Sequence, residues 1–187
     1  MKRYIPNLLT ITRIFFVPIL FWLMFIIKSD RSIFWAMIVF ILASITDYFD
    51  GLLARKFKVI TNFGKIMDPV ADKLLILIAL VAIALPPIKL VSIYAVYIII
   101  LREILISLLR NFYVKRKIYI PANVWGKVKT VLQMFGIIFA LAYYTIFSSF
   151  VTKYHYQIRF GFYIFFWYIA FITILSGLSY FFIMKKR

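Results

Sequence analysis

Four aspartates in one short stretch carry the clearest chemical signal in this sequence. The chain contains only six acidic residues, and four of them are Asp47, Asp50, Asp68 and Asp72. The first two lie three residues apart and the last two lie four apart. On helices each pair would therefore share one face, with Cβ atoms about 5–6 Å apart. Two such helix ends side by side would gather four carboxylates, which suit Mg²⁺ or Mn²⁺, especially where phosphates complete the coordination.

A structural role is the alternative for these aspartates, as carboxylates at the membrane ends of helices that pair with neighbouring Lys and Arg. That role would explain a single Asp. It does not explain two helix-spaced pairs flanked by the small residues Gly51, Ala54 and Gly64. Ionisable groups at a membrane edge are costly to desolvate without a partner and mark functional sites. The spacing therefore favours a metal site.

The elements that must position these residues are membrane helices. Hydrophobic residues make up 65% of the chain, the mean hydropathy is +0.99, and a helical span needs about 20 residues. The sequence predicts a single membrane-embedded domain, residues 1–187, folded as an all-α bundle of six transmembrane helices. The expected spans are 8–27, 33–54, 68–87, 88–109, 128–149 and 159–183. The apolar part of the second, Ile33 to Ile45, is too short to span alone, so Asp47 and Asp50 are expected on the same helix.

Turns and basic residues predict how this bundle lies in the membrane. Pro86 and Pro87 predict a sharp turn between the third and fourth spans. The two termini and the loops on the aspartate side hold fifteen Lys and Arg, whereas the opposite loops hold five. By the positive-inside rule, both termini and the aspartates are expected to face the cytoplasm. The net charge of +17 then points to anionic lipid headgroups as partners and not to nucleic acid.

Cysteine and histidine offer no second reactive centre. The chain has no cysteine, which excludes disulfides and thiolate metal sites, and its single histidine is His155. His155 is expected in an outer loop, on the side away from the aspartates. A catalytic imidazole is therefore not expected.

Other polar residues inside the predicted spans have two readings each. The four further charged residues there are Arg13, Lys73, Arg102 and Glu103. Asn7, Thr10 and Arg13 recur at three-residue steps near the start of the first helix. They form either a snorkelling entry to the membrane or a ligand contact.

Two more groups of charged residues leave a similar choice open. Glu103 and Arg110 share a helix face, which would allow either an internal charge pair or a site. Lys127 and Lys129, at the start of the fifth span, would either anchor that helix at headgroups or bind the phosphate of a soluble substrate.

The motif residues also carry a family resemblance. The pattern Asp-x2-Asp-Gly-x2-Ala-Arg-x8-Gly-x3-Asp-x3-Asp, over residues 47–72, resembles the signature of the CDP-alcohol phosphotransferase family at every fixed position. The segments 6–13, 63–73, 102–110 and 126–133 are similar to those of a bacterial branch of that family, the phosphatidylglycerophosphate synthases. The resemblance runs from Pro6 to about Gln133.

The resemblance implies a reaction and roles for the residues. The family fold is expected, with transfer of a phosphatidyl group from CDP-diacylglycerol to glycerol 3-phosphate and release of CMP. It implies one or two Mg²⁺ or Mn²⁺ ions on the four aspartates, Asp72 as general base, and a homodimer in the inner membrane. The implied donor site comprises Gly51, Ala54, Arg55, Gly64, Asn7 and Thr10. Implied contacts to the acceptor phosphate are Lys65, Arg110, Lys127 and Lys129.

Other functions remain as alternatives. Within the family, the acceptor could instead be phosphatidylglycerol, as in a cardiolipin synthase, or serine or an inositol phosphate. Outside it, a small cation transporter could hold aspartates in a helix bundle. Transporter sites lie near the membrane midplane on broken helices, whereas these aspartates are expected at one membrane face and the sequence has no inverted repeat. The enzyme is therefore the favoured interpretation.

Overall fold

The structure, a computed structural model, describes residues 5–57, 62–115, 124–147 and 154–185. Side chains are described for 12–46, 70–109, 112–113, 126, 128–147 and 154–177. Within these residues the regular structure is helical throughout, which confirms the predicted all-α class. The elements are α1 (Ile5–Phe21), continued by the π-helical segment η1 (Trp22–Ile27), α2 (Asp30–Phe57), α3 (Asn62–Ala84), α4 (Ile93–Lys115), α5 (Val124–Ala142), continued by the π-helical η2 (Tyr143–Phe147), and α6 (His155–Lys185).

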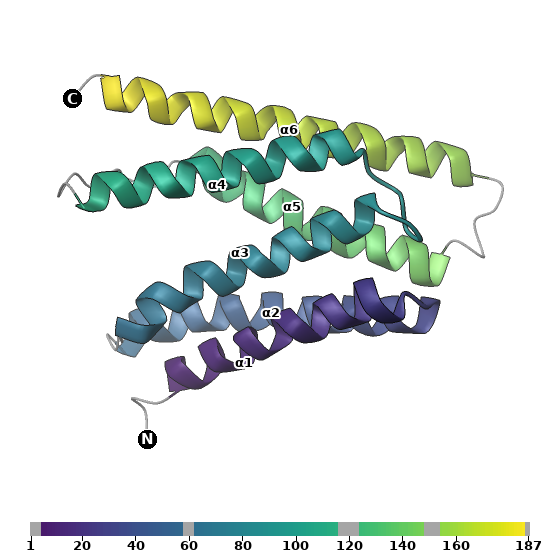
Figure 1. The fold of residues 1–187 in the computed structure, drawn as a ribbon, viewed down its shortest axis with the longest axis horizontal. Helices are drawn as coiled ribbons and strands as arrows, with labels where there is room; N and C mark the ends of the chain where they lie inside the picture. Colours follow the sequence, from purple (N-terminus) through teal and green to yellow (C-terminus); the bar gives the residue numbers. More distant parts are fainter. Residues whose placement is uncertain (1–4, 58–61, 116–123, 148–153, 186–187) are drawn as a thin grey trace.

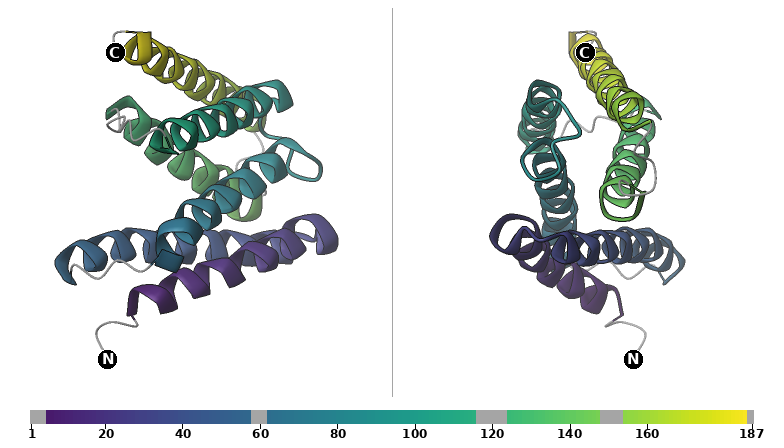
Figure 2. Two further views of the ribbon diagram at one scale, coloured as in Figure 1. Left: turned by 60° about the vertical axis from the view of Figure 1, so that its left-hand side comes forward. Right: turned by 90° about the vertical axis from the view of Figure 1, so that its right-hand side faces the viewer.

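The helices form two columns above a base (Figure 2). α1 and α2 pack together and make the base, and α1 also packs on α3. α3 and α4 form one column, and α5 and α6 form the other. α4 and α5 both contact α6, and α5 also contacts α2 and α3. A buried apolar core joins all six α-helices and includes Leu20, Phe40, Leu80, Ile99, Ile137 and Ile169.

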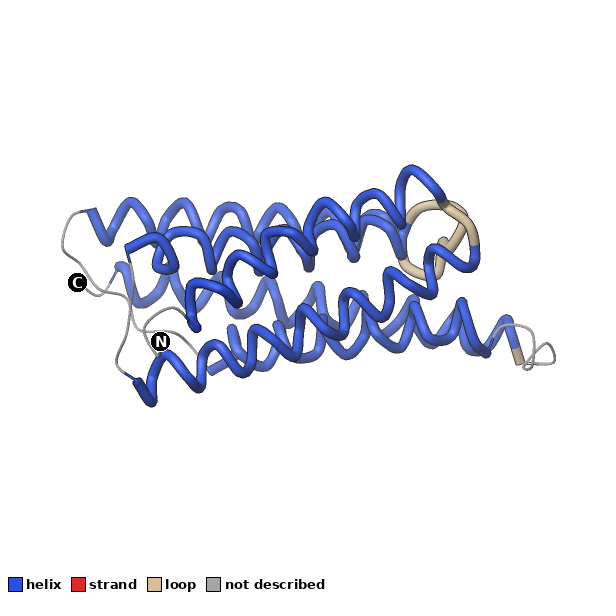
Figure 3. The backbone as a smooth tube through the Cα atoms, turned by 90° about the horizontal axis from the view of Figure 1, so that it is seen from below, coloured by secondary structure: helices blue, strands red, loops and turns tan. Residues whose placement is uncertain are grey.

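The chain reverses at two ends of this bundle (Figures 1 and 3). At one end lie the start of α1, the end of α6, and the helix ends on either side of the α2–α3 and α4–α5 connections. We call this the motif end. At the other, the far end, lie residues 28–29, the loop 85–92, the end of η2 and the start of α6. The predicted turn at Pro86 and Pro87 is present in the 85–92 loop, and α4 starts after it at Ile93.

Local chemistry explains the reversal between α1 and α2. Pro18 lies inside α1, where it removes a backbone donor, and the helix continues as the wider η1. Lys28 then adopts a left-handed conformation, with φ 52°, which ends the helix. The backbone N–H of Ser29 donates to Ser32 Oγ at 3.0 Å, and that of Ser32 donates to Ser29 Oγ at 3.1 Å. This reciprocal cap satisfies two of the first free N–H groups of α2.

The outer surface of the bundle is apolar. Trp22 and Trp35 are each 60% exposed, and many other large apolar side chains also face outwards. Among the described residues, the helical stretches Val128–Phe147 and His155–Gly177 are long and apolar enough to cross a membrane, and Thr12–Ile27 is a shorter apolar helix. Exposed apolar area of this extent marks a surface in contact with lipid or a partner.

Candidate functional site

The aspartate motif occupies the facing ends of two consecutive helices. α2 ends at Phe57 and α3 begins at Asn62. Because only four residues separate them, these two Cα atoms can lie no more than about 18 Å apart. α2 and α3 contact each other, and α1 packs on both. The motif end of α2 is therefore beside the motif end of α3 (Figure 1).

The helix backbone sets the four aspartates at two matched depths. Asp50 is seven residues before the end of α2, and Asp68 is six residues after the start of α3. At about 1.5 Å per residue, both lie about 10 Å from the α2–α3 connection. Asp47 and Asp72 are each ten residues from the same helix ends, at about 15 Å. All four positions thus belong to one end of the bundle, in two layers.

Most motif side chains lie outside the described residues. Asp72 is described and is partly exposed. The side chains of the other predicted site residues, Asp47, Asp50, Asp68, Asn7, Thr10, Gly51, Ala54, Arg55, Gly64, Lys65, Arg110 and Lys127, are not. The four-carboxylate metal site therefore stays a prediction. Its donor set fits Mg²⁺ or Mn²⁺, because these ions prefer carboxylate oxygens.

Next to Asp72, polar side chains tie three helices together inside the bundle. Lys73 on α3 donates a hydrogen bond to Ser107 on α4, and Ser107 Oγ donates to the carbonyl oxygen of Glu103 at 2.5 Å. The Glu103 carboxylate forms an ion pair with Lys129 on α5. Lys129 is only 3% exposed. The pair therefore lies in the interior between the two columns, where breaking it would leave a buried charge.

A second polar contact joins α4 to α6. Arg102 Nη2 donates to Ser176 Oγ at 2.6 Å, and Ser176 Oγ donates to the carbonyl oxygen of Thr173 at 3.2 Å. A Cβ at Gly177 would lie 3.5 Å from Arg102 Cγ and Nε. The missing side chain at Gly177 therefore lets the arginine lie close against α6.

Buried polar groups without a described partner lie in the same region. Gln133, one turn after Lys129 on α5, is 1% exposed, and Thr173 on α6 is fully buried. Neither Gln133 Nε2 nor Thr173 Oγ1 has a hydrogen-bond partner among the described residues. Buried donors of this kind need a partner, and a ligand is one way to supply it.

The structure decides two of the alternatives that the sequence left open. Arg13 does not snorkel to the surface, because its side chain is enclosed by neighbouring helices. Lys129 does not anchor α5 at headgroups, because it pairs with Glu103 in the interior. The partner of Glu103 among the described residues is thus Lys129. Whether Arg110 also approaches it is not decided, because its side chain lies outside the described set.

Some polar residues of this region were not singled out from the sequence. Ser107 and Thr173 are short hydroxyl residues within apolar helices, and the sequence offered only their helical positions as a signal. His155 is described at the start of α6, at the far end, where its Nδ1 lies 2.6 Å from the Tyr143 hydroxyl and the two rings stack. Its contacts are therefore structural ones between η2 and α6.

Comparison with known proteins gives matches that cover both the motif and the helices that carry it. Residues 3–178 match the family described as CDP-alcohol phosphatidyltransferase. Proteins named CDP-diacylglycerol–glycerol-3-phosphate 3-phosphatidyltransferase include one from Rickettsia bellii, 40% identical over 186 residues, which cover 97% of this chain and 96% of the relative. The Rickettsia felis protein of that name is 41% identical over 98% of this chain and 97% of its own length. The Haemophilus influenzae protein of that name is 39% identical over 73% of this chain and 75% of its own length. On the family match and these near full-length relatives, the chain belongs to the CDP-alcohol phosphatidyltransferase family.

Proposed function

We propose that this chain transfers the phosphatidyl group of CDP-diacylglycerol to glycerol 3-phosphate, which yields phosphatidylglycerophosphate and CMP. This reaction leads to phosphatidylglycerol and cardiolipin. The observation that carries the proposal is the position of the four motif aspartates at one end of the bundle, at two matched depths on α2 and α3. The names of relatives that cover 97% and 98% of the chain support the same donor and acceptor.

The chain is a membrane protein, and we propose that it is a single catalytic domain with six spans. Each of the six helical units, with the π-helical continuations included, has at least 23 residues. At about 1.5 Å per residue, such a unit is about 34 Å long, and the hydrocarbon core is about 30 Å thick. The basic residues gather at the motif end, so this end faces the cytoplasm and the protein lies in the inner membrane.

Reaction at a membrane surface suits the chemistry of the donor. The acyl tails of CDP-diacylglycerol stay in lipid while its diphosphate reaches the motif end. Members of the family generally depend on a divalent metal ion, and Asp47, Asp50, Asp68 and Asp72 would hold it. One or two ions of Mg²⁺ or Mn²⁺ bound there would neutralise the diphosphate and stabilise the charge of the leaving group.

Other motif residues would bind the donor. The guanidinium of Arg55 would bind two oxygens of one phosphate. Gly51 and Ala54 leave room for the nucleotide against α2, and Gly64 permits close approach of the backbone. Asn7 and Thr10, on the first turns of α1, would complete this donor site, since α1 packs on both motif helices.

Asp72 is the proposed general base. Its carboxylate would take the proton of the acceptor hydroxyl, and the oxygen would then form a bond to the phosphorus that bears the diacylglycerol. The bond from that phosphorus to the oxygen of CMP breaks, and CMP leaves with the bonding electrons. A carboxylate can serve in this role when it lies within hydrogen-bond reach of the hydroxyl. Asp72 is partly exposed, as contact with an acceptor would require.

Cations of the motif end and of the bundle interior would bind the acceptor phosphate. Lys65, Arg110 and Lys127 are proposed contacts from the motif end, and Lys129 lies deeper, paired with Glu103. A phosphate that reaches Lys129 must share this lysine with Glu103 or displace the Glu103 carboxylate.

The family resemblance further supports a homodimer, which we include in the proposal.

The test is an assay of purified protein in detergent with CDP-diacylglycerol, Mg²⁺ and a panel of alcohols, in which CMP release is followed. We expect release with glycerol 3-phosphate. Release only with phosphatidylglycerol, serine or an inositol phosphate would retain the family and reject the acceptor. No release with any acceptor would contradict the enzyme.

Asp72→Asn is the variant that tests the base in the same assay. The amide cannot accept the hydroxyl proton, so CMP release should be lost while binding of CDP-diacylglycerol largely survives. Full activity of this variant would remove Asp72 from the base role.

A further inference from the structure

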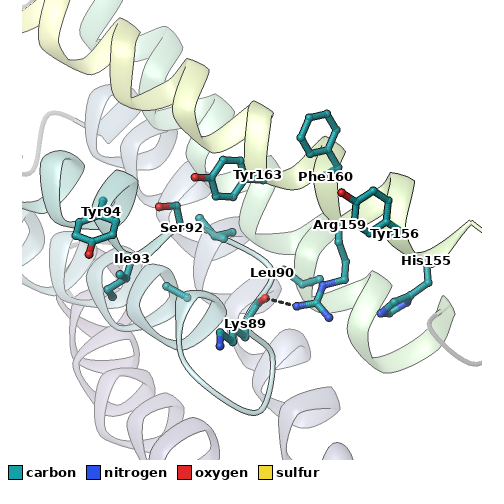
Figure 4. Close-up of a pocket in the computed structure, with 12 residues that line it drawn as sticks. Lys89, Leu90, Ser92, Ile93, Tyr94, His155, Tyr156, Arg159, Phe160 and Tyr163 are labelled. Carbon is teal, nitrogen blue, oxygen red and sulfur yellow. Dashed lines mark hydrogen bonds between the residues drawn. The ribbon is translucent and has the colours of Figure 1, made fainter.

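A cavity lies at the far end of the bundle, away from the aspartate motif (Figure 4). It has a volume of about 720 Å³ and is lined by the 85–92 loop, the start of α4 and the first turns of α6. Pockets for small ligands span about 300–1,000 Å³. Residues of the motif and of the Glu103–Lys129 network are absent from the described lining, so the cavity is separate from the proposed active site.

Two cationic residues line this cavity. Lys89 comes from the loop and Arg159 from α6. Arg159 Nη2 donates to the carbonyl oxygen of Lys89 at 3.0 Å, which holds the loop against α6 (Figure 4). The twelve described lining residues include no Asp or Glu. Two cationic side chains in a described lining without a carboxylate favour an anion as the occupant.

Apart from Ser92 and His155, the rest of the lining is apolar or consists of Tyr and Phe rings. Tyr156, Phe160 and Tyr163 are spaced along one face of α6, and all three are exposed. The Tyr163 ring lies 6.4 Å from that of Trp167, which continues the same row towards the middle of the helix. Aromatic rings of this kind favour the boundary between headgroups and acyl chains. A ligand that fits must therefore combine a negative head with an apolar tail.

We propose that this cavity binds an anionic phospholipid, with its phosphate between Lys89 and Arg159 and an acyl chain along the aromatic row of α6. Zwitterionic lipids fit less well, because no described carboxylate of the lining can pair with a choline or ethanolamine group. The proposal depends on the chain being a membrane protein. It does not depend on the proposed reaction, which belongs to the other end of the bundle.

Native mass spectrometry of the purified full chain in detergent tests this site. The probes are phosphatidic acid, phosphatidylcholine with the same acyl chains, and inorganic phosphate. We expect the wild type to retain phosphatidic acid in preference to phosphatidylcholine. Lys89→Gln combined with Arg159→Gln should weaken retention of phosphatidic acid about 30-fold, since each cation near a headgroup contributes about 1 kcal/mol.

A matched control pair removes the same charge at the same end of the bundle. Lys28 and Arg31 are exposed and do not line the cavity. Lys28 also shares the left-handed backbone of Lys89, with φ 52° and 44°. Lys28→Gln combined with Arg31→Gln should keep the preference for phosphatidic acid. Arg159→Lys, which keeps the charge, should retain most of the binding, and Lys89→Gln alone, which keeps the Arg159 bond to the loop, should lose part of it.

Four results would overturn the proposal. The first is an equal loss of phosphatidic acid retention in the two double variants, and the second is unchanged retention of phosphatidic acid in the Lys89/Arg159 pair. The third is retention of inorganic phosphate as tightly as phosphatidic acid. The fourth is a change of oligomeric state in the Lys89/Arg159 pair with unchanged lipid preference, which would identify the cavity as an interface between copies of the chain. Size-exclusion profiles like that of the wild type establish that each variant is folded.

Discussion

At the scale of single residues, the ion pair between Glu103 and Lys129 is the contact that most affects the proposed chemistry. Lys129 is 3% exposed and the Glu103 side chain 20%, so solvent screens the pair only weakly. Lys73 reaches the same helix turn of α4 through Ser107. This arrangement holds the Lys129 cation deep in the bundle, paired with Glu103, and we propose that an anion entering from the motif end competes with Glu103 for it.

Substitutions of this pair separate its effect on stability from its effect on substrate binding. Glu103→Gln leaves Lys129 as a buried cation without its carboxylate, and we expect a loss of about 2–3 kcal/mol in the free energy of unfolding. Adding Lys129→Met should restore much of that loss, because the double variant buries no charge. Thermal unfolding in detergent measures both.

Lys129→Ala and Lys127→Ala should raise KM for glycerol 3-phosphate more than KM for CDP-diacylglycerol.

The control for these kinetics is Lys28→Ala, which removes an exposed lysine at the far end and should change neither KM. Equal stability of Glu103→Gln and the wild type would mean that the pair contributes nothing to the fold. If acceptor KM stays unchanged in both lysine variants, the phosphate pocket lies elsewhere.

At the scale of elements, contacts between helices depend on where small residues allow close approach. Gly136 on α5 faces two rings of α6: a Cβ at this position would lie 2.7 Å from Phe165 Cε1 and 3.1 Å from Phe166 Cζ. Real Cβ atoms do not approach other atoms so closely, so an added methyl must move the rings or the helix. Small residues at interfaces serve the same purpose in membrane helices generally.

Gly136→Ala should therefore destabilise the bundle although alanine is the better helix former. Overpacking of a core costs about 1–3 kcal/mol, and it should exceed the gain of about 1 kcal/mol from helix propensity. The melting temperature of the purified protein measures the balance. Gly161→Ala on α6 is the matched control, because nothing lies within 4 Å of a Cβ there; it should be neutral or stabilising. An equal gain in both variants would show that α5 and α6 do not pack as closely as described.

At the scale of the whole molecule, the two ends of the bundle differ in charge and in proposed task. The motif end holds the aspartates and most basic residues, and the far end holds the cavity with Lys89 and Arg159. A membrane gives this asymmetry a direction, since loops rich in Lys and Arg stay in the cytoplasm. The substrates would then meet at the motif end, and the far-end cavity would lie in the outer leaflet.

The absence of cysteine makes this direction simple to test. Gln157→Cys introduces a thiol at an exposed position of α6 at the far end, and Lys117→Cys introduces one in the α4–α5 connection, outside the described residues. A maleimide that cannot cross membranes should label Gln157→Cys in intact cells and Lys117→Cys only after permeabilisation. The cysteine-free wild type should stay unlabelled, and both variants should label in detergent. The reverse pattern would invert the orientation.

The sequence by itself determined the helical class, the turn at Pro86 and Pro87, and the motif that belongs to its family. These follow from local rules: the length of apolar runs, the backbone limits of proline, and fixed spacing along a helix. The matched depths of Asp47 with Asp72 and of Asp50 with Asp68 depended on the observed helix ends at Phe57 and Asn62.

Only the tertiary structure decided which side chains meet. The partner of Glu103 is Lys129 on another helix, Arg13 is enclosed and not at the surface, and a cavity forms where the 85–92 loop meets α6. The spans are apolar around most of their circumference, so the sequence pattern does not fix the rotation of each helix about its axis. Packing between residues far apart in the chain fixes that rotation, and with it the polar contacts inside the bundle.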